Sequence, residues 1–233
     1  MASTKKITVA VDGPAGSGKS TVSKLIAQRN NLLYLDTGAM YRAITWLALS
    51  LGLDIESHKE QIISATSQAT LVLHQPTNVN DSIRVILNQR DITGEIRNET
   101  INQNVSLISA IPEIREILVS LQQRLGAEGD VILDGRDIGT VVFPKADLKI
   151  YLVASVSERA KRRHKEEREK GMNERTLAEV AAEIEARDYK DMNRKISPLC
   201  KAEDAIEINT DGMTIDQVVE RIEAEILKIR STF

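Results

Sequence analysis

The apolar residues of this chain fall into short β-branched runs separated by longer stretches with helical spacing. Ile7–Val11 is such a run and ends at the turn-forming Asp12-Gly13-Pro14, which predicts a buried strand entering a loop. From Ser20 to Asn30 the apolar positions fit one helical face, Leu32–Leu35 predicts a second strand, and residues 38–51 return to helical spacing. This alternation of strands and helices predicts an α/β fold with a parallel sheet flanked by helices.

The middle of the chain departs from the alternation. Short apolar runs between residues 69 and 96 are separated by turn-rich segments, which predicts a small antiparallel sheet inserted into the α/β pattern. Two helices should follow, the second beginning near Pro112. The later elements expected are strands at Val131–Leu133, Leu148–Val153 and Ala205–Ile208, a helix at about Thr176–Tyr189, and a terminal helix opened by a capping box of Thr214 and Gln217.

The composition excludes several classes of protein. A length of 233 residues with 42% hydrophobic residues suits one α/β domain with insertions or two small domains. A net charge of −3 gives no basic surplus for nucleic acid. No apolar stretch reaches the ~18 residues of a membrane span, no signal-peptide core precedes the first strand, and Cys200 is the single cysteine. We therefore expect a cytoplasmic protein without a disulfide and without a membrane or nucleic-acid partner.

A complete phosphate-binding motif connects the first strand to the first helix. It satisfies G-x-x-x-x-G-K-[ST] in the strand–loop–helix context that the motif requires. The loop N–H groups and the helix start attract a phosphate chain, Lys19 can reach its β- and γ-phosphates, and the Ser20 hydroxyl can ligate Mg²⁺. The expected nucleotide-binding residues are Gly13, Pro14, Ala15, Gly16, Ser17, Gly18, Lys19, Ser20 and Thr21.

A second motif separates a kinase from other P-loop proteins. The chain has no N/T-K-x-D motif of a guanine-reading switch, and it is short and acidic for a motor. A kinase needs a second anion site, and Asp134-Gly135-Arg136-Asp137 follows a predicted strand at the edge where ligands of open α/β sheets bind. Here Asp134 can organise Mg²⁺, directly or through its waters, and Arg136 can hold a phosphate. The alternative is a tight turn with solvated charges.

In the helix predicted after residue 176, the apolar face gives way to charged residues near residue 187. The apolar positions of the helix after residue 176 continue at the same spacing as Arg187, Asp191 and Arg194. A core-facing stripe becomes ionic where it meets a polar cavity or where the helix ends. Two guanidiniums flanking a carboxylate suit a phosphorylated sugar, with a solvated ion-pair face as the alternative.

Five segments occur in a characteristic order along the chain. They are GPAGSGKST at 13–21, LDTGAMYRA at 35–43, GEIR at 94–97, DGRDIGTVVFP at 134–144 and ARDYKDMNR at 186–194. Together they closely resemble the bacterial cytidylate kinase family over essentially the whole chain. The second and fourth segments are far more specific than the P-loop alone.

The resemblance implies transfer of the γ-phosphoryl group of ATP, held with Mg²⁺, to CMP or dCMP in pyrimidine nucleotide metabolism. A kinase for UMP or AMP, or a nucleotide-controlled switch or binding module, are the alternatives. Many relatives have Gly where this chain has Ser20, so either Ser20 or Thr21 could supply the Mg²⁺ ligand. The implied catalytic residues are Lys19, Arg136 and Arg187. The implied acceptor-binding residues are Thr37, Tyr41, Arg42, Ser106, Arg115, Asp134, Arg136, Asp137, Arg187, Asp191 and Arg194.

Individual roles and a domain division also follow from the resemblance. It implies that Arg42 and Arg136 hold phosphate, that Ser106 and Arg115 contact the cytosine, and that Asp137 accepts from its amino group. It further implies a monomer with three parts. These are a CORE at 1–36, 104–154 and 195–233, an acceptor-binding insertion at 37–103, and a lid with its flanking helix at 155–194. For the basic stretch at 155–170, a solvated helix face is the alternative to a lid.

Overall fold

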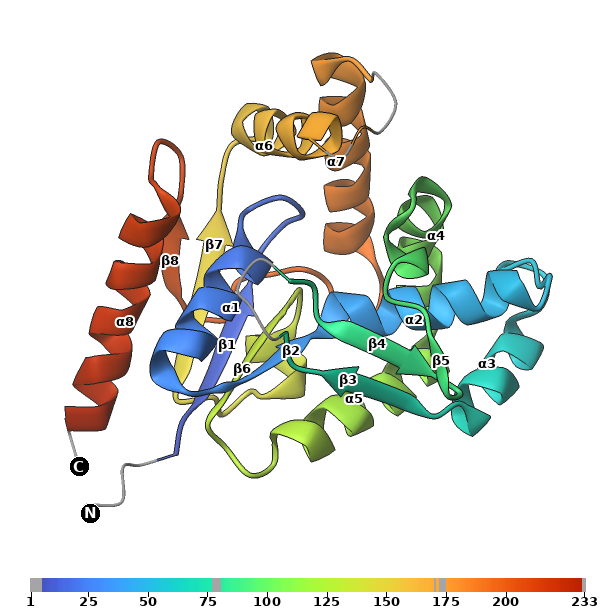
Figure 1. The fold of residues 1–233 in the computed structure, drawn as a ribbon, viewed down its shortest axis with the longest axis horizontal. Helices are drawn as coiled ribbons and strands as arrows, with labels where there is room; N and C mark the ends of the chain where they lie inside the picture. Colours follow the sequence, from blue (N-terminus) through green and yellow to red (C-terminus); the bar gives the residue numbers. More distant parts are fainter. Residues whose placement is uncertain (1–5, 77–80, 170, 172–174, 232–233) are drawn as a thin grey trace.

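The computed structural model describes residues 6–76, 81–169, 171 and 175–231. A five-stranded parallel sheet with the strand order β2-β6-β1-β7-β8 forms its centre (Figure 1). The predicted parallel sheet is confirmed, with strand ends shifted by one or two residues. Its strands are β1 (Thr8–Asp12), β2 (Leu33–Asp36), β6 (Val131–Gly135), β7 (Leu148–Val153) and β8 (Ile206–Asn209).

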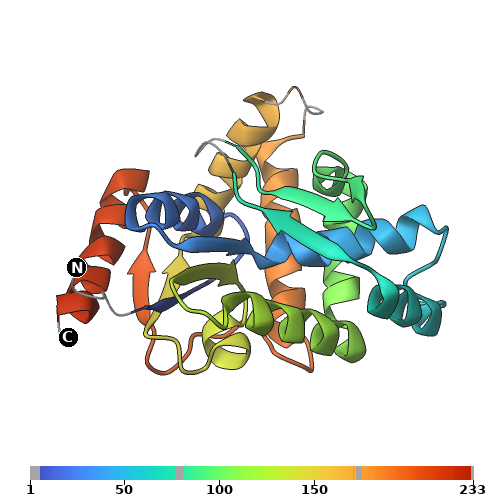
Figure 2. The same cartoon turned by 60° about the horizontal axis from the view of Figure 1, so that its bottom comes forward.

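Alternation along each strand builds one core on either face of the sheet, because successive side chains of a strand point to opposite faces. Val9 and Ile132 pack with residues of α1 (Lys19–Asn30) and α8 (Ile215–Ser231). Ala10 and Leu133 belong to a second cluster, against which Val119 of α5 packs. Figure 2 brings this second face forward, with α5 (Pro112–Gly126) across it. The capping box predicted for α8 is confirmed by the bond from Gln217 N to Thr214 Oγ1, at 3.3 Å.

The predicted antiparallel insertion is present as a three-stranded sheet beside the main one (Figure 1). Its last strand, β5, has only two residues, and the chain then turns into a short 3₁₀ helix. A third apolar cluster joins the helices around this sheet. The elements of this region are α2 (Thr37–Ser50), α3 (Lys59–Gln68), β3 (Leu71–His74), β4 (Arg84–Leu87), β5 (Arg90–Asp91), η1 (Glu95–Arg97) and α4 (Glu99–Ser109).

Two helices, α6 (Val156–Glu169) and α7 (Leu177–Asn193), stand beyond the carboxyl ends of the sheet strands (Figure 1). They pack through a small cluster of Ala160, Val180 and Ile184. Thr176 opens α7 with a capping box, and the helix continues four residues past its predicted end at Tyr189. Arg187 and Asp191 therefore lie within the helix. None of the described helices is long and apolar enough to cross a membrane.

Candidate active site

The P-loop curls because its three glycines, Gly13, Gly16 and Gly18, have positive φ angles that other residues avoid. Gly13 has φ 146°, and a Cβ atom there would lie 2.1 Å from the carbonyl oxygen of Leu152 on β7. Gly18 has φ 93° and precedes α1 without a side-chain cap. The first N–H groups of α1 therefore remain available to an anion at the helix start.

Lys19 is folded back onto the loop in which it stands. Its side chain is buried, and Nζ donates to the carbonyl oxygen of Pro14 at 2.6 Å and to Ser17 Oγ at 3.4 Å. Burial, and then the nearby charge of Arg136, hold the pKa of Lys19 well below its ordinary value. A phosphate would restore a favourable environment for this ammonium group, since an opposite charge nearby favours the charged form.

Asp134 gathers oxygen atoms at the end of β6. Ser20 Oγ donates to Asp134 Oδ2 at 2.6 Å, and Tyr34 Oη donates to Oδ1 at 2.8 Å. Thr37 Oγ1 donates to the Asp134 carbonyl oxygen at 2.7 Å. Burial, and then the charge of Asp36, raise the pKa of Asp134. Thr21, by contrast, is exposed on α1, so the geometry favours Ser20 as the hydroxyl that accompanies this carboxylate.

Asp12 ties the P-loop strand to the segment that follows Arg136 and Asp137. Its two carboxylate oxygens accept from the backbone N–H groups of Ile138, at 2.8 Å, and Gly139, at 2.7 Å. Burial raises the pKa of Asp12 to about 6, although these hydrogen bonds oppose the change. No pattern in the sequence indicates this contact, because its donors are backbone N–H groups 126 and 127 positions along the chain.

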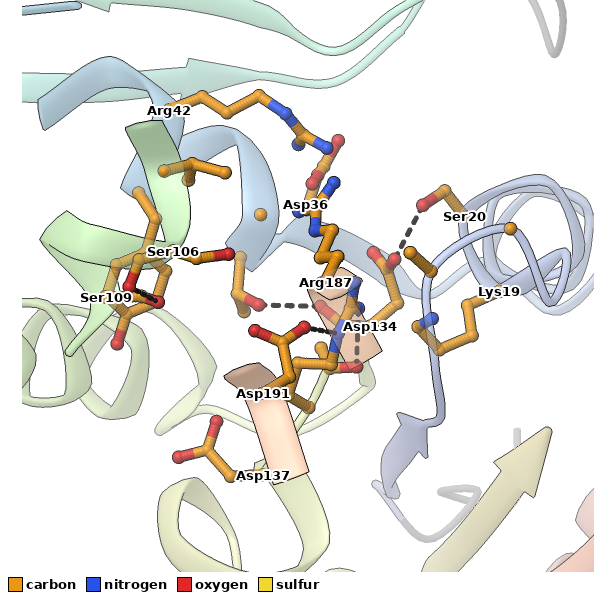
Figure 3. A pocket seen from close by; sticks show the side chains of 18 of the residues that line it. Lys19, Ser20, Asp36, Arg42, Ser106, Ser109, Asp134, Asp137, Arg187 and Asp191 are labelled. Atoms are coloured by element: carbon orange, nitrogen blue, oxygen red, sulfur yellow. Dashed lines mark hydrogen bonds and ion pairs between the residues drawn. The ribbon is translucent and has the colours of Figure 1, made fainter. Parts of the chain in front are cut away.

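One open cavity lies between the P-loop, α2, α4, the end of β6 and α7, and Figure 3 shows many of its side chains. Every acceptor-site residue implied by the family resemblance lines this cavity, together with Ala15, Gly16, Lys19 and Ser20 of the P-loop. The other predicted P-loop residues, Gly13, Pro14, Ser17, Gly18 and Thr21, do not line it. The described lining residues that sequence reasoning missed are Asp36, Gly38, Val105, Ser109, Gly135 and Arg163.

Positive charge exceeds negative charge among the described lining residues, with seven cationic side chains against four carboxylates. The cations are Lys19, Arg42, Arg115, Arg136, Arg163, Arg187 and Arg194, and the carboxylates are Asp36, Asp134, Asp137 and Asp191. Such a surplus in a partly enclosed site attracts anions.

Arg187 is the least compensated of these cations. Its Nε is buried and has no hydrogen-bond partner among the described residues. Burial, then the charges of Arg136 and Arg42, lower the pKa of Arg187 to about 9. In Figure 3 this side chain projects toward the centre of the cavity. Buried charges are normally paired, so this guanidinium is suited to bind an anion.

The far side of the cavity holds a second, internally paired group. Asp137 forms ion pairs with Arg115 and, at 3.5 Å, with Arg194. The Arg115 guanidinium also lies 5.4 Å from the centre of the Tyr41 ring, whose hydroxyl is buried and has no hydrogen-bond partner among the described residues. Nearby, Arg136 Nε donates to Asp191 Oδ2 at 2.9 Å. A planar, polar ligand would find both an acceptor and donors on this side.

Comparison with known proteins gives the same family as the motifs. A family model described as cytidylate kinase matches residues 9–228. A cytidylate kinase of Streptococcus pneumoniae (strain 70585) is 50% identical over 224 residues, covering 96% of this chain and 99% of that protein. The bifunctional pantoate ligase/cytidylate kinase of Trichodesmium erythraeum is 47% identical over 218 residues, and there this chain spans 40% of the longer protein.

A solved gluconokinase from Sinorhizobium meliloti is similar in fold, with a TM-score of 0.50 at 12% identity over 97% of this chain and 95% of that one. At that identity the likeness concerns the fold alone, and it agrees with the P-loop kinase architecture. The family resemblance predicted from the motifs is confirmed by the sequence matches. The chain belongs to the cytidylate kinase family.

Proposed function

We propose that this chain transfers the γ-phosphoryl group of ATP to CMP or dCMP, giving ADP and CDP or dCDP. The observation that carries the proposal is a cavity in which the P-loop faces a surplus of guanidinium groups. Donor and acceptor are both polyanions, so their mutual repulsion opposes the reaction. Fixed cations offset that repulsion and stabilise the charge that spreads over the transferring phosphoryl group.

On the donor side, the residues present fit Mg²⁺. The Ser20 hydroxyl and the Asp134 carboxylate lie 2.6 Å apart, and Mg²⁺ is commonly held by one or two carboxylates together with substrate phosphates. Ser20 would bind the ion directly and Asp134 directly or through water. Bound there, Mg²⁺ would neutralise phosphate charge. Lys19 would exchange its bond to the Pro14 carbonyl for the β- and γ-phosphates.

On the acceptor side, Arg42, Arg136 and Arg187 would hold the monophosphate. Its second pKa is near 6, so at neutral pH the attacking oxygen is ionised and needs no general base. Asp137, which forms ion pairs with Arg115 and Arg194, would accept from the exocyclic amino group of cytosine. Uracil offers a carbonyl there, and a polar mismatch of this kind discriminates by up to ~10⁴–10⁵.

The test is ADP formation from ATP and Mg²⁺ with CMP, dCMP, UMP, AMP or no acceptor. We expect rapid turnover with CMP and dCMP only. A kinase for another acceptor would prefer UMP or AMP, and a switch would turn over slowly and equally in every case. Lys19→Ala and Arg136→Ala should each lower turnover by orders of magnitude while circular dichroism shows a retained fold. Near-normal rates in both folded variants would contradict the proposal.

The domain division stays part of the proposal. Such a kinase would divide into a CORE at residues 1–36, 104–154 and 195–233, an acceptor-binding part at 37–103 and a lid at 155–194. The boundary at residue 104 falls inside α4. A monomeric state and a cytoplasmic location belong to the same proposal. Light scattering of the purified chain would measure the first.

A further inference from the structure

Arg163 on α6 reaches the active-site cavity from the side of the two helices above the sheet. It lines the cavity together with Arg42 and Arg187. Burial is the main cause that lowers the pKa of both of those groups, and the positive charge of Arg163 contributes to each. Three guanidiniums from α2, α6 and α7 thus face one space.

A buried carboxylate holds Arg163 in this place. Arg163 Nε donates to Glu167 Oε1 at 2.7 Å, and within the described part of the chain this is the one hydrogen bond of that guanidinium. The Glu167 side chain is 6% exposed, whereas that of Arg163 is 32% exposed. The bond uses only Nε, and within the described part of the chain the two terminal nitrogens make no hydrogen bond, so they can bind an anion.

Glu167 is itself fixed by Arg175, which lies just before α7. Arg175 donates to both carboxylate oxygens, with its Nε 3.3 Å from Oε2, and it also forms an ion pair with Glu183 of α7. Burial acts to raise the pKa of Glu167, but the hydrogen bonds from Arg163 and Arg175 outweigh it and keep the pKa below its ordinary value. The carboxylate therefore stays charged at neutral pH and joins α6 to α7.

An ordinary surface pair on the same helix shows the contrast. Lys165 and Glu169 have the same i,i+4 spacing, but their charged groups are 3.9 Å apart and their side chains are 79% and 66% exposed. Exposed pairs of this kind contribute little. Glu167 is buried and shared by two arginines, which is the arrangement of a group that orients a neighbour.

We propose that Glu167 is a positioning residue, which directs the Arg163 guanidinium toward the phosphates in the active-site cavity. This inference rests on the proposed function. Because Glu167 fixes the guanidinium before substrate arrives, little side-chain freedom remains to be lost in the transition state. Two terminal nitrogens can then meet two phosphoryl oxygens in the bidentate geometry that arginine favours.

The experiment is a double-mutant cycle on kcat, with ADP formation measured at saturating ATP and CMP. Arg163→Ala should lower kcat by about 10³-fold, as for other arginines in phosphoryl transfer. Glu167→Gln should lower kcat by about 10- to 100-fold, which is the effect expected when a catalytic group is displaced slightly from its best position. If Glu167 acts through Arg163, Glu167→Gln should have no further effect on kcat in the Arg163→Ala background. Glu169→Gln, the matched exposed control, should leave kcat unchanged.

Thermal melts of each variant separate positioning from folding. If Glu167→Gln does not fold, Glu167→Asp keeps the charge between the two arginines and withdraws it by one methylene, so kcat should still fall while the melting temperature is retained. Additive effects on kcat, or wild-type kcat in a folded Glu167 variant, would overturn the positioning role. A wild-type chain that does not phosphorylate CMP would instead overturn the proposed function, and this inference with it.

Discussion

Arg187 carries a buried charge whose Nε finds no hydrogen-bond partner in the described part of the chain. Its nearest charged neighbours include Arg136 and Arg42, and its pKa is lowered to about 9 by burial and by those charges. Asp191 offsets the charge only in part, since its own hydrogen bond goes to Arg136. A fold selected for stability alone would not retain this buried charge, because it lowers stability. A role in anion binding explains why it is retained.

Replacing Arg187 with Met should therefore separate stability from activity. Without nucleotide, Arg187→Met should unfold at higher urea concentration, with a gain of roughly 1–2 kcal/mol, because an uncompensated buried charge is removed. With ATP and CMP, kcat/KM should fall by about 10³-fold. Urea denaturation and ADP formation measure the two effects.

Arg29→Met is the control, since Arg29 lies in the last turn of α1, does not line the cavity and forms an exposed ion pair with Asp216. Its stability and its activity should match the wild type. An Arg187→Met variant that loses stability and keeps its activity would show that Arg187 is a structural residue.

At the scale of elements, the P-loop depends on how closely β1 and β7 run side by side. Asp12 is paired with Tyr151 in the parallel register, so Gly13 leaves the sheet directly against the backbone of Leu152. No side chain fits between the two backbones. The glycine is thus required by the sheet as well as by the phosphate.

Gly13→Ala should lose ATP binding and destabilise the fold by more than about 2 kcal/mol, because strain at a positive φ adds to a contact with rigid backbone. Gly52→Ala is a matched control. Gly52 also has a positive φ, 68°, but nothing lies within 4 Å of the added Cβ. The Gly52→Ala variant should lose about 1 kcal/mol of unfolding free energy and retain its activity. Urea denaturation and ATP titration measure both, and equal losses would contradict the role of the β7 contact.

At the scale of the whole molecule, the ionisation of Asp12 makes the stability of the fold depend on pH. Asp12 is 5% exposed and clamps two N–H groups that follow the acceptor-side motif. Its pKa rises from 3.8 in the unfolded chain to about 6 in the fold. A raised carboxyl pKa stabilises the fold below the unfolded pKa, and this contribution is lost as pH rises through the folded value.

The stability of the wild type relative to Asp12→Asn should therefore fall between pH about 4 and about 6, by up to about 3 kcal/mol. Other carboxylates, such as Asp36 and Asp191, have lowered pKa values and act in the opposite direction. They are common to both proteins and cancel in the difference. Urea denaturation across this range checks the sign, and parallel stability curves would contradict it.

Much of this protein is determined by its sequence alone. Spacing within a few residues defined the P-loop, the five parallel strands and the small antiparallel sheet, because these depend on local conformation and on the alternation of side chains. The motifs also identified acceptor-side residues that gather in one cavity, Arg42 and Arg187 among them. α3 was missed, since a helix that buries only Ile62 and Thr66 shows little amphipathic pattern.

Tertiary structure alone decided which of these charges are paired. Asp12 meets backbone groups 126 and 127 positions away, and Ser20 meets Asp134 across 114 positions. α7 runs on past Tyr189 while Asp191 bonds with Arg136 on another element. The same holds for Glu167, whose position between Arg163 and Arg175 depends on how α6 packs on α7. Such pairings follow from long-range packing, which the local spacing of residues cannot predict. They also determine which cations can bind phosphate.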